Sequence, residues 1–217
     1  MTLHNPRLVP TGERKHMSNN DGRTPQEVLD ELEGKLSALT KEYADGHINP
    51  AQYNAIYRYY SEKRALIEHI LDTSPDNPTW RAVSENHNTD YLIKQFEARV
   101  LYYVVFKRGN EVPLVTDGKI PRKGAEQVIK LLQSLWGTTD WRKGVARKSL
   151  GEGMFLVLCI GDQAMTLCVF LLQPSTIQIN RLKDMHEDFE RANRNLLKKD
   201  VTPERMVFPQ RGLIENK

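Results

Sequence analysis

The chain has 217 residues, a length that fits one complete domain with an additional element, or two small domains. Hydrophobic residues make up 39% of the sequence and charged residues 27%, a composition that excludes a wholly disordered chain. The net charge of +3 is too small to indicate a nucleic-acid-binding protein. The longest apolar stretch, Met154 to Leu172, is interrupted by Gly161 and Asp162, so neither half is long enough to cross a bilayer as a helix.

The N-terminal segment combines proline, glycine, asparagine and charged residues without hydrophobic periodicity, and we predict a disordered tail over residues 1–23. It has no apolar region of the signal-peptide type, so the sequence predicts a cytoplasmic protein. Cys159 and Cys168 are expected on neighbouring strands but not opposite each other. We therefore predict two free buried thiols, as in a reducing compartment.

Two helices are predicted within residues 24–73. Thr24 and Glu27 have the spacing of a capping box at the start of the first helix, and Asn49 precedes the second. Gly46 is expected to end the first helix. Apolar residues spaced by three and four positions give each helix one buried face. The residues expected to pack this helical hairpin are Leu29, Leu32, Leu36, Leu39, Tyr53, Ile56, Tyr60 and Ile67.

Two helices of this length leave part of their apolar faces uncovered. That surface must pack on the rest of the chain or on a second copy, which gives the hairpin a possible role in oligomerisation. We interpret its tyrosines as packing residues, and a peptide-binding groove is the alternative. Residues 74–88, rich in proline and asparagine, are predicted to form a linker.

A domain of mixed helices and strands is predicted over residues 89–197, followed by a flexible C-terminal tail over residues 198–217. A short helix within residues 89–97 leads into the first strand, and Pro113 places the second strand at a sheet edge. In chain order, the strands are Val100–Phe106, Val112–Val115, Trp141–Leu150, Met154–Ile160 and Met165–Leu172, with helices at Ala125–Trp136 and after Ser175.

The two strands nearest the C-terminus are apolar on both faces, so helices must cover both sides of the sheet. The predicted fold class is therefore α+β: a three-layer α/β/α sandwich on a five-stranded antiparallel sheet, preceded by a helical hairpin. Profilin-like, roadblock, longin and PAS-like domains share this element order, and the order alone does not distinguish among them.

Residues 90–197 resemble the roadblock/dynein-light-chain family of the profilin-like superfamily. The matching pieces are the strand Val100–Phe106, the helix Ala125–Trp136 and the segment LGEGMFLVLCIGDQAMTLCVFLLQPSTIQINRLKDMHEDFERANRNLL. The chain departs from the family before its first strand, where Phe96-Glu97-Ala98-Arg99 stands in place of a glycine-rich entry. The resemblance implies a non-enzymatic dimeric scaffold or regulator that binds a small Ras-like GTPase or a related signalling partner.

In dimers of that family, the strand after the central helix pairs with its copy and the central helices pack together. The dimer interface that the resemblance implies here consists of Val128, Leu132, Trp136, Trp141 and Val145. The predicted edge strand also carries four basic residues, which we interpret as partner-binding: Arg142, Lys143, Arg147 and Lys148. The alternative is that these charges protect the edge from pairing.

The sequence contains no GxxxxGK(S/T), HExxH or CxxC motif. The six histidines are expected on tails, linker and helix surfaces, and Asp184, Glu187, Asp188 and Glu190 on a solvated helix face. We therefore predict no enzyme activity, no cofactor and no metal. Nucleic-acid binding is disfavoured because no aromatic residues alternate with the basic ones. The alternative function is a PAS-like small-molecule sensor with the hairpin as its oligomerisation element.

Overall fold

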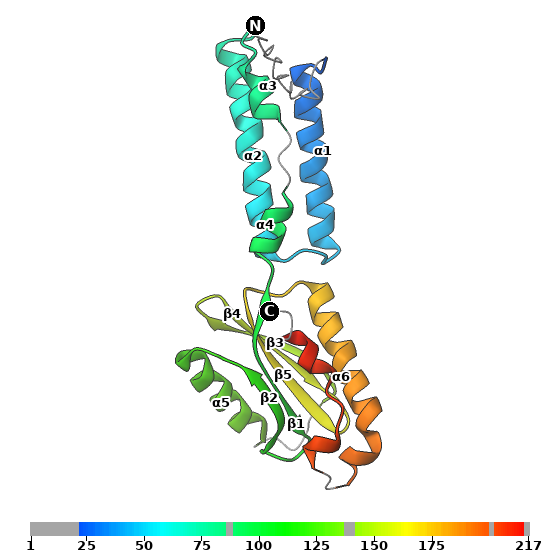
Figure 1. Ribbon diagram of the computed structural model, residues 1–217. Helices are drawn as coiled ribbons and strands as arrows, with labels where there is room; N and C mark the ends of the chain where they lie inside the picture. The colour runs from blue at the N-terminus through cyan, green and yellow to red at the C-terminus, as the bar shows by residue number, and fades with distance from the viewer. Residues whose placement is uncertain (1–21, 86–88, 137–141, 200–201, 215–217) are drawn as a thin grey trace, which may run out of the picture.

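The computed structural model describes residues 22–85, 89–136, 142–199 and 202–214 (Figure 1). The molecule is elongated, with α1–α4 at one end and the sheet with α5 and α6 at the other. In chain order, the elements are α1 (Pro25–Ala44), α2 (Pro50–Thr73), α3 (Thr79–Ser84), α4 (Asp90–Gln95), β1 (Arg99–Lys107), β2 (Pro113–Gly118), α5 (Arg122–Trp136), β3 (Gly144–Gly151), β4 (Met154–Ile160), β5 (Ala164–Leu171), α6 (Thr176–Leu197) and the short 3-10 turns η1 (Pro203–Arg205) and η2 (Pro209–Leu213).

The predicted helix starts are confirmed by their hydrogen bonds. The Thr24 side chain accepts from the backbone N–H of Glu27, whose carboxylate accepts from the Thr24 N–H at 2.7 Å. Asn49 and Gln52 make the same reciprocal pair at the start of α2, with both bonds at 2.8 Å. Gly46, at φ 75°, lies directly after the last turn of α1, in the left-handed region that suits glycine.

The helical hairpin is packed by two clusters of apolar side chains. Toward its free end, Val28, Leu32 and Ile67 surround Trp80 of α3, a helix that forms within the segment predicted as a linker. Toward the sheet, Leu39, Ala55 and Ile56 contact Leu92 of α4. These clusters include every predicted hairpin-packing residue except one: Leu29, Leu32, Leu39, Tyr53, Ile56, Tyr60 and Ile67 belong to them, and Leu36 is half-buried outside them.

The predicted α+β class with a five-stranded antiparallel sheet is confirmed. The strand order is β2-β1-β5-β4-β3, so the strand that contains Pro113 lies at one edge and β3 at the other. The β4–β5 hairpin pairs Cys159 with Thr166 and Val157 with Cys168. The two cysteines are therefore not opposite each other, and both are free and buried.

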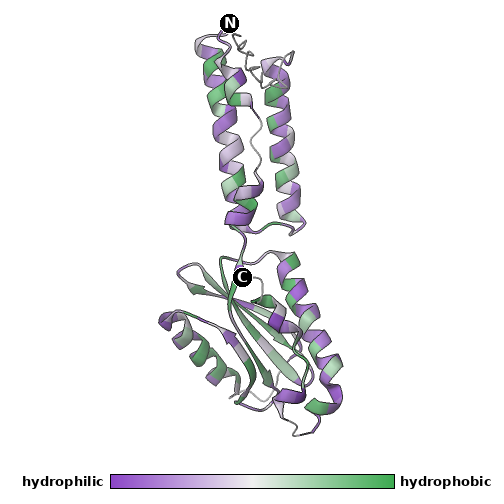
Figure 2. Cartoon of the chain, viewed as in Figure 1, coloured by the Kyte–Doolittle hydropathy of each residue, from purple (hydrophilic) through white to green (hydrophobic). Residues whose placement is uncertain are grey.

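Each face of the sheet is covered by one long helix (Figure 1). On one face, Val128 and Leu132 of α5 pack with Val104, Leu156 and other strand residues. On the opposite face, Leu182, Phe189 and Leu197 of α6 pack with strand residues that include Tyr103 and Val157. Figure 2 shows the corresponding pattern, in which hydrophobic residues fill the central strands and alternate with hydrophilic ones along both helices.

The C-terminal segment is not the flexible tail that the sequence predicts. Residues 202–214 return along α6, where Met206 and Phe208 join the core and the Phe208 ring stacks on Phe189 at a centroid distance of 5.2 Å. The Asn193 side chain accepts from the Val207 N–H at 2.9 Å and donates to the Val207 carbonyl at 2.7 Å. The prediction was wrong because this segment has no helical or strand period and is held by individual contacts.

The hairpin and the sheet part are joined by hydrogen bonds at the α1–α2 turn. The carbonyl of Gly46 accepts from the N–H of Ile177 in the first turn of α6 at 3.3 Å. Asn49 and Gln52 donate from their side chains to the carbonyls of Phe96 and Ile93 at 2.8 and 2.7 Å. The same residues that cap α2 therefore also fix it to the α4–β1 connection.

The described part of the chain contains no helix with the length and apolar character that a membrane span requires.

Candidate functional site

Strand β3 forms one edge of the sheet. Among the described residues it pairs only with β4, from Gly144 opposite Ile160 to Gly151 opposite Met154. Six of its eight residues are exposed, and it contains no proline. The N–H and C=O groups on its outer side are a template for an added strand.

The basic residues around β3 do not form one stripe. Arg147 pairs with Val157, which belongs to the core under α6, whereas Lys148 pairs with Leu156, which belongs to the core under α5. Their side chains therefore project from opposite faces of the sheet. Arg142 and Lys143 are exposed just before the strand, and Lys143 makes an ion pair with Asp162 at 2.5 Å. The result is a basic rim around the strand edge.

The structure does not bring the predicted dimer residues together. Val128 and Leu132 are buried beneath α5 in the chain's own core, so a second copy does not reach them while α5 stays on the sheet. Trp136 is half-buried against Phe106 in an edge-to-face contact, with ring centroids 5.3 Å apart. Val145 is half-buried on the opposite face, against the α6-side core. Trp141 lies outside the described residues.

A cavity of about 610 Å³ lies between the β4–β5 turn, the start of β3 and the C-terminal half of α6. Glu190, predicted on a solvated helix face, instead accepts from the backbone N–H groups of Gln163 and Ala164 at 2.7 and 2.8 Å. It also accepts from the N–H of Asp162 at 3.2 Å. A carboxylate of α6 thus binds the β4–β5 turn, whose residues line the cavity. Basic lining residues outnumber acidic ones: Lys143, Lys183, Arg191, Arg194 and Lys198 against Asp162, Glu187 and Glu190.

His186 lines this cavity and is buried, contrary to the predicted surface histidines. Its Nδ1 lies 2.8 Å from Oγ1 of Thr166, which also accepts from the amide of Gln210 at 3.4 Å. Burial lowers the pKa of His186 against the opposing effect of Glu190 and Glu187, which favours the neutral form of the ring. Within the described chain, His186 Nε2 and Gln163 Oε1 have no hydrogen-bond partner, which leaves two polar atoms beside the cavity.

The thiol form of the cysteine that lines the cavity is favoured over the thiolate by burial. Burial raises the pKa of Cys159 to about 12, and the neighbouring Glu187 adds to this shift. The pKa of Cys168 is raised well above its usual value for the same reason of burial. Because the reactive form of cysteine is the thiolate, both residues act as small core side chains.

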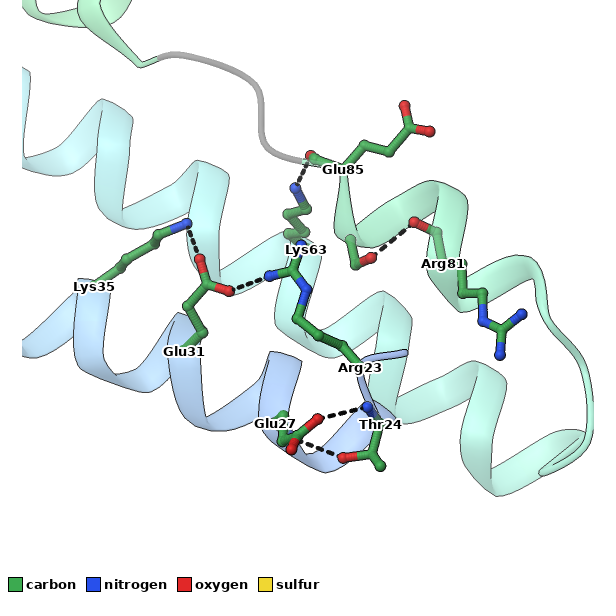
Figure 3. Close-up of polar contacts among 9 residues, drawn as sticks. Arg23, Thr24, Glu27, Glu31, Lys35, Lys63, Arg81 and Glu85 are labelled. Atoms are coloured by element: carbon green, nitrogen blue, oxygen red, sulfur yellow. Dashed lines mark hydrogen bonds and ion pairs between the residues drawn. The ribbon is translucent and has the colours of Figure 1, made fainter. Parts of the chain in front are cut away.

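The free end of the hairpin carries a polar network (Figure 3). Glu31 bridges Arg23 and Lys35, with both N–O distances at 2.7 Å. Lys63 donates to the carbonyl of Glu85 at 2.5 Å, and burial together with the nearby charge of Lys35 lowers its pKa. The contacts join α1 to Arg23, two residues before the helix begins, and α2 to Glu85, the residue that follows α3. We therefore interpret the network as structural.

Among the described residues, no group of three or more histidine, cysteine, aspartate or glutamate side chains is placed to hold a metal ion. No protein-family model matches the chain, and none of the curated proteins or solved structures compared with it matches significantly.

Proposed function

We propose that this protein is a non-enzymatic scaffold or regulator whose sheet domain, of the roadblock type, binds a small Ras-like GTPase or a related signalling partner. The single observation that carries the proposal is the edge strand β3, whose eight proline-free residues have an outer side that no other described part of the chain pairs with. Support comes from the five-stranded antiparallel sheet with a helix on each face, which is the architecture that the resemblance implies.

Self-association is part of the proposal, and the burial of Val128 and Leu132 favours the helical hairpin as its site. Large apolar side chains stay exposed there, with Tyr57 at 44% and Leu66 at 48%. Tyr57 continues a row of rings with Tyr53 and Tyr43, at centroid distances of 5.6 and 4.7 Å. Exposed aromatic rings of this kind are typical anchors of protein interfaces.

The first experiment is light scattering behind a sizing column on the full chain and on the variants Tyr57→Glu and Ile129→Lys. We expect a dimer for the full chain and for Ile129→Lys, and a monomer for Tyr57→Glu. A dimer that only Ile129→Lys dissociates would place self-association on α5. A monomeric full chain would contradict the dimer.

The partner class is tested by capture. The full chain, immobilised through its N-terminus, is mixed with purified small GTPases loaded with GDP or with a non-hydrolysable GTP analogue. Retention that depends on the nucleotide supports a regulator, and retention independent of it supports a scaffold. If no GTPase is retained in either state, the GTPase proposal fails.

A second candidate function, a small-molecule sensor, is favoured by the cavity beside His186. Its volume of about 610 Å³ is in the range of ligand-binding pockets, and its lining residues His186 and Gln163 each carry a buried polar atom without a hydrogen-bond partner in the described chain. A thermal-shift screen against metabolites, repeated with His186→Gln, tests this. A ligand that stabilises the native chain but not the variant would support the sensor, and a screen without any stabilising compound would count against it.

A further inference from the structure

We propose, building on the partner-binding edge of the proposed function, that β3 accepts an acidic extended peptide as a sixth, antiparallel strand. The two edges of the sheet differ in a way that selects β3 for this role. At the other edge, β2 is shorter and contains Pro113, which has no N–H to donate. β3 is longer, proline-free and exposed along most of its length.

The charges on β3 disfavour a second copy as the added strand. Residues that pair across antiparallel strands lie on the same face of the sheet. If two β3 strands pair about a two-fold axis, the residue at that axis therefore lies directly opposite its own copy. The two registers with the greatest overlap of Gly144–Gly151 place this axis at Arg147 or at Lys148. Either register sets a cation directly opposite its own copy, an arrangement that destabilises strand pairing.

An acidic strand meets the same positions with opposite charge. Because Arg147 and Lys148 project from opposite faces, two consecutive acidic residues of an incoming strand pair with both of them. The partner residue two positions C-terminal to the one opposite Arg147 lies opposite Val145. Because Val145 is half-buried, an apolar side chain fits at that partner position. The edge therefore selects the pattern acidic, acidic, any residue, apolar, in the N-to-C direction of the partner.

Arg142 and Lys143, just before β3, extend the preference for acidic partner residues beyond the strand itself. Both are exposed at the β3 end near Gly144, and an antiparallel partner passes them with its residues C-terminal to the apolar position. Acidic residues there add long-range attraction, which raises the association rate and weakens with salt.

The test is fluorescence anisotropy with the full chain and a labelled peptide, Thr-Val-Glu-Glu-Thr-Val-Thr. We expect saturable binding, and at least about tenfold weaker binding when both glutamates are replaced by lysine. A control peptide has proline in place of the threonine that follows the two glutamates. It keeps the charge but loses a backbone N–H donor and the strand conformation. Equal binding of the proline peptide, or no binding of the parent peptide, overturns the proposal.

The site is tested with the variant Arg147→Glu together with Lys148→Glu, two exposed positions where we expect the fold to persist. We expect the double variant to lose the glutamate peptide and to bind the lysine peptide. Hydrogen exchange should slow in β3, and not in β2, when the glutamate peptide is added to the wild-type chain. Unchanged binding in the double variant, or equal protection of both edges, overturns the proposal.

Other occupants of the edge are outcomes of the same measurements. If the β3 amides gain protection as the protein's own concentration rises, a second copy occupies the edge and the peptide proposal is wrong. A single-stranded DNA oligonucleotide that binds more tightly than the peptide also overturns it. These results are distinct from failure of the scaffold function, which is measured by GTPase capture and by light scattering on Tyr57→Glu.

Discussion

The two faces of the sheet are covered by different kinds of contact. On the α5 face, burial of apolar side chains such as Val128 and Leu132 holds one amphipathic helix. On the α6 face, the helix is joined by the C-terminal segment, and buried polar side chains tie the pieces together. Apolar contact favours burial without fixing geometry, whereas buried polar groups need defined partners. The α6 face therefore has one specified arrangement, whereas the packing of α5 depends mainly on the volume of its apolar side chains.

The largest expected effect contrasts a truncation on each face. Phe189→Ala removes a fully buried ring and its stacking on Phe208, and we expect a loss of about 3–5 kcal/mol in the free energy of unfolding. Leu132→Ala on the α5 face is expected to cost about 2–4 kcal/mol. Urea denaturation measures both, and hydrogen exchange should show that only Phe189→Ala exposes residues 206–208. Equal exposure of residues 206–208 in both variants would contradict the difference between the two faces.

The next effect concerns the amide that holds the C-terminal segment. Asn193→Ala removes both bonds to the Val207 backbone, and we expect a loss of about 2 kcal/mol because those backbone groups are left without partners. The matched control is Asn195→Ala, on the exposed side of the same helix, with an expected change within about 0.5 kcal/mol. A similar result for both variants would mean that Asn193 does not position the segment.

A smaller, pH-dependent effect is expected at His186. Since burial lowers its pKa, the unfolded chain binds the proton more readily than the native one, and stability falls as pH drops below the ordinary value of 6.5. His186→Gln is expected to cost about 1 kcal/mol at pH 7. Unfolding measured from pH 7.5 to 5 should show the gap between wild type and variant narrowing. A constant gap would mean that His186 does not titrate differently in the two states.

The smallest expected effect concerns the exposed side of α5. Ile129 is 54% exposed on the outer side of α5, and Ile129→Lys is expected to change stability by no more than about 0.5 kcal/mol. Thermal unfolding at two protein concentrations measures this. A destabilisation that is larger at the higher protein concentration and shrinks on dilution would show that the outer side of α5 lies in an interface.

The helices and strands could be predicted from the sequence because their signals are local. Capping boxes at Thr24 and Asn49 and the turn glycine Gly46 stand in the sequence at the helix ends themselves. The C-terminal segment and α3 could not be predicted, since Phe208 and Trp80 are single aromatic residues whose burial depends on distant partners. Long-range contacts of this kind leave no period in the sequence.

The candidate site was predicted only in part. The open edge of β3 and its basic residues follow from local polarity, but their division between two faces depends on the register with β4. The buried His186 carried a signal that was overlooked: it lies four residues after Leu182 and three before Phe189, on the apolar face of α6. Glu190 could not be assigned to the β4–β5 turn, because that contact joins residues 26 and more positions apart.

The contact at Gly46 has a mechanical consequence. A side-chain carbon at this position would lie 2.5 Å from Cβ of Thr176, so only glycine lets the α1–α2 turn approach the first turn of α6 this closely. A torque applied to the hairpin is therefore delivered to α6 at its N-terminal end, and α6 leads from there to the cavity at its other end. His186 lies midway along that helix, so the hairpin and the cavity are joined through α6.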